Sequence, residues 1–208
     1  MKIRIGRRKK TAAPKPGRKK QTQLRLPIEE LAVASVKTKA GRVYLVCSAH
    51  GLREVRLGGS EAPSRKEARA RGVRYVRRPK WSAGAVRAIE RFLSGREIPA
   101  ALPLDLAFGT PFQRRVWDAT RRVPWGQVES YSAIAARAGA PRAVRAVGNA
   151  LGKNPVPIVV PCHRVIHYAG SIGGFTSGLD WKRYLLSLER GQLELSWRPR
   201  RRVLGLFR

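Results

Sequence analysis

Cysteine, histidine and acidic residues are scarce in this sequence. Its 208 residues include two cysteines and three histidines, at Cys47, Cys162, His50, His163 and His167. Two distant cysteines do not make a disulfide framework, so we expect a reducing compartment. These five residues also lack the spacing of a zinc site. We therefore expect neither a bound metal nor another cofactor.

Long apolar runs are also absent. No stretch reaches the roughly 20 residues that a membrane-spanning helix needs, so we expect no membrane contact. The N-terminus is basic, but it lacks the apolar segment of a secretory signal. A chain of 208 residues suits one or two small domains with a real core.

The shortage of acids leaves an extreme charge. Against 44 Lys and Arg stand 13 Asp and Glu, which gives a formal net charge of +31. A charge of this size predicts a polyanionic partner, and nucleic acid is the first candidate. The alternative is a solubilising or salt-tolerant surface, which we favour less because adaptation to salt usually makes proteins acidic.

Much of the excess charge lies in the two tails. Residues 1–26 hold 11 Lys and Arg and no acid, with Pro14, Pro16 and Gly17 among them. Such a segment repels itself and buries nothing, so we expect it to be disordered and to bind phosphates nonspecifically. A localisation signal is the alternative. Residues 193–208 form a second basic tail.

After the first tail the pattern becomes apolar and rich in β-formers. Three runs, at residues 31–36, 43–47 and 52–57, are separated by Gly-containing turns and predict an antiparallel meander. Cys47 lies in the second run and is expected in the core. Residues 60–80 are basic and polar and predict a surface connection. Nothing in this part of the chain suggests catalysis, so we expect it to support the part that follows.

Five helices are predicted beyond residue 80. Ser82 is expected to cap a helix whose apolar positions are Val86, Ile89, Phe92 and Leu93. Thr110, followed by Pro111, predicts the start of another helix. Ser130 is expected to cap a helix over residues 131–138, and a further helix is predicted over residues 142–151. A last helix is predicted over residues 179–190.

Two of these helices are joined by the tight turn Gly139-Ala140-Pro141, which is typical of a helix-turn-helix. An ordinary helical hairpin in a core is the alternative. The second helix has small residues that would allow close approach to a groove but little readout of base edges: Ala143, Ala146, Gly148 and Ala150. Residues 170–178 form a glycine-rich loop. A phosphate cradle is disfavoured there because no Lys-Ser/Thr closes the loop.

The most informative stretch is Pro161-Cys162-His163-Arg164-Val165, which follows the apolar run at residues 156–160. A cysteine beside a base can become a thiolate, which is a strong nucleophile. A free cysteine is more often a small, inert core residue. The pair alone leaves both interpretations open.

The flanks of this stretch decide the matter. The run RAVGNALGKNPVPIVVPCHRV, residues 145–165, closely resembles the active-site signature of the O6-alkylguanine-DNA alkyltransferases. The resemblance extends over residues 109–191, with a weaker match back to Leu31. It implies a ribonuclease-H-like antiparallel sheet domain, followed by a mainly helical, winged helix-turn-helix-like domain. The fold class is thus mixed α and β.

The resemblance also implies boundaries and a function. We expect a basic tail at residues 1–26, the sheet domain at 27–106, the DNA-binding alkyltransferase domain at 107–192 and a tail at 193–208. The family flips O6-alkylguanine, and also O4-alkylthymine, out of double-stranded DNA and transfers the alkyl group irreversibly to a cysteine. We therefore expect a monomer whose partner is alkylated duplex DNA. It would be cytoplasmic and associated with the nucleoid, or nuclear in a eukaryote.

Roles for individual residues follow by resemblance only. Cys162 matches the acceptor, and His163 the base that reaches it through a water. Glu189 matches the carboxylate that orients the imidazole, although a solvated helix-end residue is the alternative. Asn154 matches the asparagine that hydrogen-bonds around the active-site turn.

The resemblance assigns the remaining residues to the base and the duplex. Tyr131 matches the tyrosine that rotates the nucleotide and donates a proton to the departing base. Arg145 matches the arginine that fills the vacated stack, and a plain phosphate contact is its alternative. Phe175 stands where many relatives have tyrosine, so it keeps a stacking role but no hydroxyl. The other residues that the resemblance assigns to DNA and the base pocket are Ser132, Ala143, Gly148, Pro157 and Thr176.

Two other functions remain to be weighed. An alkyltransferase-like lesion sensor would bind the damage without reacting, but those proteins replace the cysteine that this chain keeps at Cys162. An architectural DNA binder would not need a cysteine, a histidine and a glutamate at the motif positions, yet Cys162, His163 and Glu189 are all present. Some family members carry a structural zinc in the N-terminal part, for which this chain has no ligand set.

The charge of the tails leads to a first prediction. Deleting residues 1–26 and 198–208 should weaken binding to intact and damaged DNA alike. The slope of log affinity against log salt should flatten by about 0.9 for each phosphate that the tails neutralise. The rate of alkyl transfer at saturating DNA should stay the same. A salt titration paired with single-turnover transfer checks this, and an unchanged slope would show that the tails do not bind phosphates.

Overall fold

The computed structural model describes residues 28–58, 63–77, 79–167 and 170–191. The basic tails expected at residues 1–26 and 193–208 lie outside these ranges. None of the helices in the described ranges is long and apolar enough to cross a membrane.

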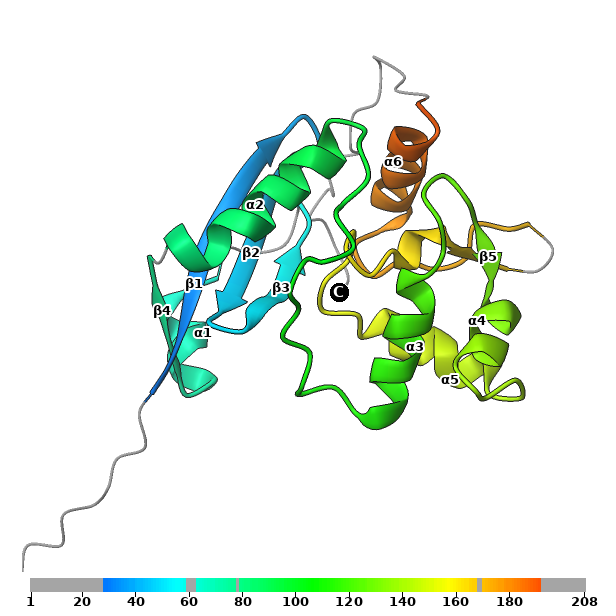
Figure 1. Ribbon diagram of the computed structural model, residues 1–208, viewed down its shortest axis with the longest axis horizontal. Helices are drawn as coiled ribbons and strands as arrows, with labels where there is room; N and C mark the ends of the chain where they lie inside the picture. Colours follow the sequence, from blue (N-terminus) through cyan, green and yellow to red (C-terminus); the bar gives the residue numbers. More distant parts are fainter. Residues whose placement is uncertain (1–27, 59–62, 78, 168–169, 192–208) are drawn as a thin grey trace, which may run out of the picture.

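The N-terminal half is a sheet with a helix on each face. Strands β1 (Glu29–Thr38), β2 (Gly41–Ser48) and β3 (Gly51–Arg56) form the expected antiparallel meander. Their alternating apolar residues face α2 (Pro79–Leu93), which lies across β1 and β2 (Figure 1). Register places Ala32, Ala34 and Val36 opposite Cys47, Leu45 and Val43. Cys47 is fully buried, as predicted.

The structure of residues 60–80 differs from the predicted surface connection. They do not form a plain connection but contain α1 (Arg65–Ala70) and β4 (Val73–Val76) before α2 begins. Strand β4 pairs with β1 in parallel, so the sheet has the order β3-β2-β1-β4 and is mostly, not wholly, antiparallel. Both elements are too short and too basic to give a hydrophobic period, which explains why the sequence pattern missed them.

Two smaller predictions are also wrong. Ser82 does not cap α2 but lies buried within it, because the helix already begins at Pro79. Ala150 does not belong to an exposed row of small residues. It is 3 % exposed, and its carbonyl accepts a hydrogen bond from Trp117 Nε1 at 3.0 Å.

The C-terminal half is helical, as predicted. It contains α3 (Pro111–Arg121), α4 (Tyr131–Arg137), α5 (Val144–Gly152) and α6 (Leu179–Glu189). Thr110 caps α3 in a capping box with Gln113, and Ser130 caps α4 by accepting from Ala133 N–H. Helices α4 and α5 pack together across the turn that starts at Gly139, whose φ is 72°. A left-handed φ of this kind is what glycine permits after a helix.

A two-stranded sheet brings distant segments of this half together. Strand β5 (Glu129–Ser130) pairs in parallel with β6 (Val165–Ile166). Because β5 directly precedes Tyr131 and β6 follows closely after Cys162, the pairing places the start of α4 beside the cysteine loop. A two-residue strand has no sequence period, so this link was not predictable.

One apolar core joins the two halves of the chain. It contains sheet residues such as Leu45 and Val55, α2 residues such as Phe92, and Trp117, Val160 and Leu185 from beyond residue 107. A second core lies among α3, α4 and α5. The division at residues 106–107 stays a prediction, and the two sides of it pack against each other through a shared interior.

Candidate active site

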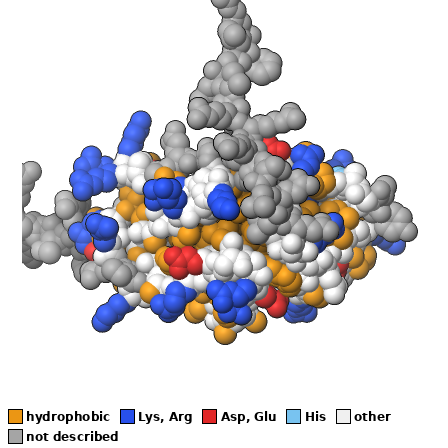
Figure 2. All heavy atoms as spheres, turned by 90° about the horizontal axis from the view of Figure 1, so that it is seen from above, with side chains coloured by type: hydrophobic (Ala, Val, Ile, Leu, Met, Phe, Trp, Pro, Cys, Tyr) orange, Lys and Arg blue, Asp and Glu red, His pale blue; other side chains and the backbone are white. Residues whose placement is uncertain are grey.

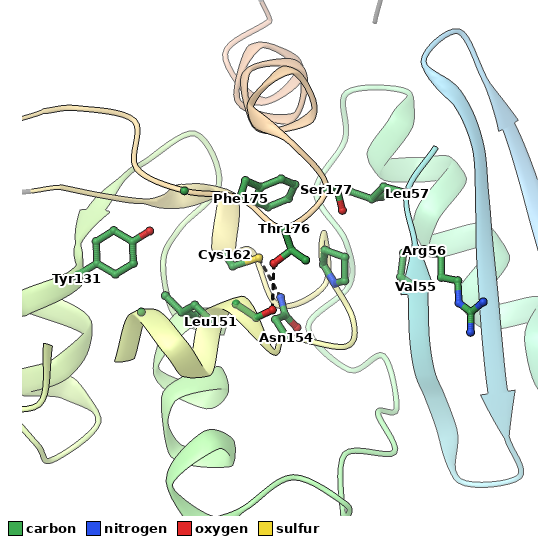
Figure 3. A pocket seen from close by; sticks show the side chains of 14 residues that line it. Val55, Arg56, Leu57, Tyr131, Leu151, Asn154, Cys162, Phe175, Thr176 and Ser177 are labelled. Atoms are coloured by element: carbon green, nitrogen blue, oxygen red, sulfur yellow. Dashed lines mark hydrogen bonds between the residues drawn. The ribbon is translucent and has the colours of Figure 1, made fainter. Parts of the chain in front are cut away.

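Cys162 lies at the base of a cavity of about 400 Å³ between the helical half and the edge of the sheet (Figure 3). It begins a short 3-10 turn, Cys162–Arg164, and is 9 % exposed. The cavity is lined from several directions by α4, α5, the loops around Cys162 and strand β3. Its lining includes Tyr131, Gly148, Leu151, Asn154, Pro157, Cys162, Phe175, Thr176, Val55, Arg56 and Leu57.

Asn154 holds the cysteine loop by its side-chain amide. Its Nδ2 donates to the Val160 carbonyl at 2.8 Å and to Cys162 Sγ at 3.0 Å, while its Oδ1 accepts from Val156 N–H at 3.0 Å. The predicted bonding around the turn is present, and a direct contact with the sulfur is added to it. A hydrogen bond to sulfur favours the thiolate over the thiol.

The loop that Asn154 holds is strained. Ile158 has a φ of 79°, a left-handed conformation that a β-branched residue rarely adopts. Such a residue costs about 1–3 kcal/mol and persists only where its surroundings fix it. Ile158 is 2 % exposed, and the loop is closed by the bond from Val160 N–H to the Val156 carbonyl at 2.9 Å.

His163 is fully buried and is held by Glu189, the last residue of α6. The distance from His163 Nε2 to Glu189 Oε1 is 2.7 Å. The Glu189 carboxylate also accepts from both Nε and Nη2 of Arg164, at 2.9–3.0 Å, and from Gly126 N–H at 3.0 Å. Glu189 is therefore not a solvated helix end. Arg164 completes the cluster by donating to the Val123 carbonyl at 2.5 Å.

The geometry fixes the tautomer of His163. Burial acts to raise the pKa of Glu189, but the bonds from His163 and Arg164 outweigh it and lower that pKa, so the carboxylate is ionised. An ionised carboxylate only accepts, which requires His163 Nε2 to carry its proton. Burial lowers the pKa of His163, so the ring is neutral and Nδ1 is unprotonated. Among the described residues, buried Nδ1 has no hydrogen-bond partner.

The cysteine itself rests as a thiol. Burial raises the pKa of Cys162 to about 11, against the opposing effects of the Asn154 amide and the Lys182 ammonium. A nucleophile in this state needs a base when the electrophile arrives. Cys47 also has a pKa raised to about 11 by burial, but it is fully enclosed in the sheet core.

Sequence reasoning gave no role to Lys182 or Arg164. Lys182 is fully buried, and its Nζ donates to the Val165 carbonyl at 2.6 Å, directly beyond the Cys162 turn. Burial lowers its pKa to about 8. Two charged residues this deeply buried are unusual, but their burial is visible only in the fold. Arg164 stood in the quoted motif, so its position beside His163 was the available signal.

Other predicted residues lie outside the cavity lining. Arg145 is exposed in the first turn of α5, and Ser132 is exposed in the first turn of α4. Ala143 is half-buried at the start of α5. These three lie on the helix pair that borders the cavity through Tyr131 and Gly148.

Thr176, by contrast, lines the cavity, and its hydroxyl donates to the Gly152 carbonyl at 3.0 Å.

The described residues contain no group of three or more His, Cys, Asp or Glu side chains that could hold a metal ion. The chemistry available at the cavity is that of one cysteine, a neutral histidine held by a carboxylate, and a tyrosine. Such a set suits attack by sulfur on a carbon electrophile, with the histidine as base.

Comparison with known proteins agrees with this chemistry. Residues 111–191 match the family model described as 6-O-methylguanine DNA methyltransferase, DNA binding domain. A methylated-DNA–protein-cysteine methyltransferase from Mycolicibacterium paratuberculosis is 47 % identical over 116 residues, which cover 56 % of this chain and 70 % of the relative. A relative from Methanosarcina barkeri with the same name is 42 % identical over 120 residues, covering 57 % and 75 %.

A solved structure extends the similarity to both halves of the chain. The Mycobacterium tuberculosis OGT, crystallised in complex with DNA, matches with a TM-score of 0.66 and 36 % identity. The match covers 77 % of this chain and 94 % of that one. The resemblance to the alkyltransferases and the mixed α and β fold class, both drawn from the sequence, are thereby confirmed. This chain belongs to the methylated-DNA–protein-cysteine methyltransferase family.

Proposed function

We propose that this protein reverses DNA alkylation directly, by moving the alkyl group of O6-alkylguanine in duplex DNA to Cys162. The observation that carries the proposal is the position of Cys162 in a base-sized cavity, bonded by Asn154 and followed in the same turn by His163, which Glu189 holds. The relatives named above act on methylated DNA, and one was crystallised with DNA. O4-alkylthymine is a second substrate of the same chemistry.

The transfer is a substitution at the alkyl carbon. The Cys162 sulfur forms a bond to that carbon while the bond from carbon to the guanine oxygen breaks. The thiol proton passes to His163 Nδ1, through a bridging water in the family's mechanism, and Glu189 stabilises the imidazolium that results. Tyr131 gives the departing guanine a proton. The thioether product is stable, so each molecule acts once.

The remaining residues present the base. The target nucleotide must leave the stack before it can enter the cavity, which costs a few kcal/mol. Arg145, exposed at the start of α5, would fill the gap, and Ser132 and Ala143 lie where the same helix pair meets the backbone. Gly148 leaves room beside Tyr131. Phe175 would stack on the base, Thr176 would offer backbone contacts to the alkylated oxygen, and Pro157 would wall the alkyl group.

The lesion-sensing alternative is disfavoured because Cys162 is present and reachable. We infer that a repair protein of this kind works as a monomer on duplex DNA and needs no cofactor. Its place is where chromosomal DNA lies, in the cytoplasm at the nucleoid, or in the nucleus of a eukaryote.

Replacing the acceptor is the most direct test. Cys162→Ala should abolish transfer and keep DNA affinity within about threefold, because the small side chain removes no phosphate contact. Mass spectrometry after incubation with methylated duplex should find one methyl per wild-type molecule, on the peptide that contains Cys162. Methylation of Cys47, or transfer that persists in the variant, would refute the assignment.

The role of Glu189 is tested by a pair of variants. Glu189→Gln should slow single-turnover transfer by at least about tenfold, because a neutral amide stabilises the imidazolium less. It also leaves the Arg164 charge buried and unpaired, which is destabilising. Glu189→Gln combined with Arg164→Met removes that imbalance. If the double variant recovers stability but stays slow, Glu189 acts through His163; recovery of both would make its role structural.

Arg145 is tested by comparing two substrates. Arg145→Ala should slow repair of methylated duplex by about tenfold or more, because nothing then holds the vacated stack open. Repair of free O6-methylguanine should change little, since the free base needs no flipping. Equal losses on both substrates would contradict the proposed role and point to a fault in the fold.

A further inference from the structure

The charge of this protein is not confined to its tails. Of the 44 Lys and Arg, 28 lie between residues 27 and 192, a range that contains 12 of the 13 acids. Lys and Arg side chains are spread over the face shown in Figure 2, with few acidic side chains among them. The surfaces where these cations lack acidic neighbours are therefore candidates for contact with a polyanion.

The sheet has one face that α2 does not cover. Because strand residues alternate, Ser35 and Lys37 of β1 point away from the face on which Val36 meets α2. Register places Arg42 of β2 opposite Lys37. Helix α1 lies on this side too, since its Glu67 bonds to Arg56 of β3 and to Tyr75 of β4. We name this side, the sheet surface with α1 upon it, the α1 face.

The α1 face carries five exposed cations without an acidic partner. Arg65, Lys66 and Arg69 project from α1, and Lys37 and Arg42 from the strands. None of the five forms an ion pair within the described part of the chain, and Arg42 donates only to Ser35 Oγ at 3.0 Å. Three acids lie on this face in the described part of the chain, and all are paired: Glu54 and Glu67 with Arg56 and Arg71, and Glu29 of β1 with Arg53.

This face borders the cavity. Arg56 lines the cavity with its backbone neighbours Val55 and Leu57, and its guanidinium turns away from Cys162 toward the sheet (Figure 3). Its Nη1 donates to Glu67 of α1 at 3.0 Å. A single side chain thus separates the wall of the cavity from α1. The four strands of the sheet span about 14 Å, and a duplex of that length carries roughly eight phosphate charges.

We propose that the α1 face binds the phosphate backbone of the duplex that flanks the nucleotide held in the cavity. This inference rests on the proposed function for the position of the duplex. It adds a contact with the DNA backbone to the N-terminal half of the chain, which also lines the cavity through Val55, Arg56 and Leu57. Contacts of this kind carry no sequence information but fix the orientation of the protein on DNA.

A matched pair of triple variants in the full chain tests the proposal. The first carries Arg65→Ala, Lys66→Ala and Arg69→Ala on α1. The second removes three exposed charges on or just beyond α2, with Lys80→Ala, Arg87→Ala and Arg96→Ala. Both lose the same charge, so only position distinguishes them. Lys37→Ala with Arg42→Ala repeats the first test on the strands, in case the α1 variant does not fold.

The readout is the salt dependence of binding to a long and to a short duplex with one O6-methylguanine. On the long duplex, the α1 variant should flatten the log–log slope by about 2–3 units and the α2 control by less than about one unit. On a duplex too short to reach past the cavity, the two variants should agree. Transfer from the free base should match wild type in both.

Other outcomes overturn the proposal. Equal slopes for the two variants would mean that total charge alone matters. A difference that persists on the short duplex, or binding of two duplexes by one protein, would place the contact on a second DNA molecule and not on the flank. If the wild-type protein transferred no alkyl group from free O6-methylguanine, the proposed function would be refuted instead. That failure can be told apart from failure of the α1 proposal, because transfer from the free base does not involve α1.

Discussion

The buried carboxylate of Glu189 is the interaction on which the site depends. Removing an ion from water costs several kcal/mol, which is recovered only if its lone pairs are satisfied in good geometry. Here His163, Arg164 and Gly126 N–H all donate to it. These donors come from the turn after Cys162 and from the turn after α3. One carboxylate thus fixes the end of α6, the cysteine turn and residue 126 relative to one another.

The N-terminal half fixes the other side of the cavity. Val55 N–H in β3 donates to the Pro155 carbonyl at 2.8 Å, directly after Asn154, and Trp181 Nε1 in α6 donates to the Gly58 carbonyl at 3.0 Å. A Cβ at Gly58 would lie 3.0 Å from the Trp181 ring, which accounts for the glycine. The sheet therefore supports the loop that carries Asn154. Beyond the supporting role that the sequence predicted, this half also contributes Arg56 to the lining of the cavity.

The sequence predicted those strands and helices that show a hydrophobic period or a helix-capping residue. The three meander strands and the helices begun by Thr110 and Ser130 were found because apolar alternation, helical spacing and capping residues are local signals. The short elements β4, β5, β6 and α1 show no clear hydrophobic period and were missed. Cys162 and His163 came from a motif, but the burial of Lys182 and the enclosure of Glu189 by Arg164 depend on tertiary packing. No local pattern encodes such packing.

The strained loop explains how a buried thiol can still be presented to a substrate. The left-handed φ of 79° at Ile158 reverses the backbone direction between Val156 and Val160. Asn154 offsets that strain with bonds at both ends of the turn, to Val156 N–H and to the Val160 carbonyl. The same amide reaches the sulfur, so the group that holds the loop also acts on the nucleophile. Asn154 therefore both supports the strained backbone at Ile158 and contacts the nucleophile, and the cavity is organised before any base enters it.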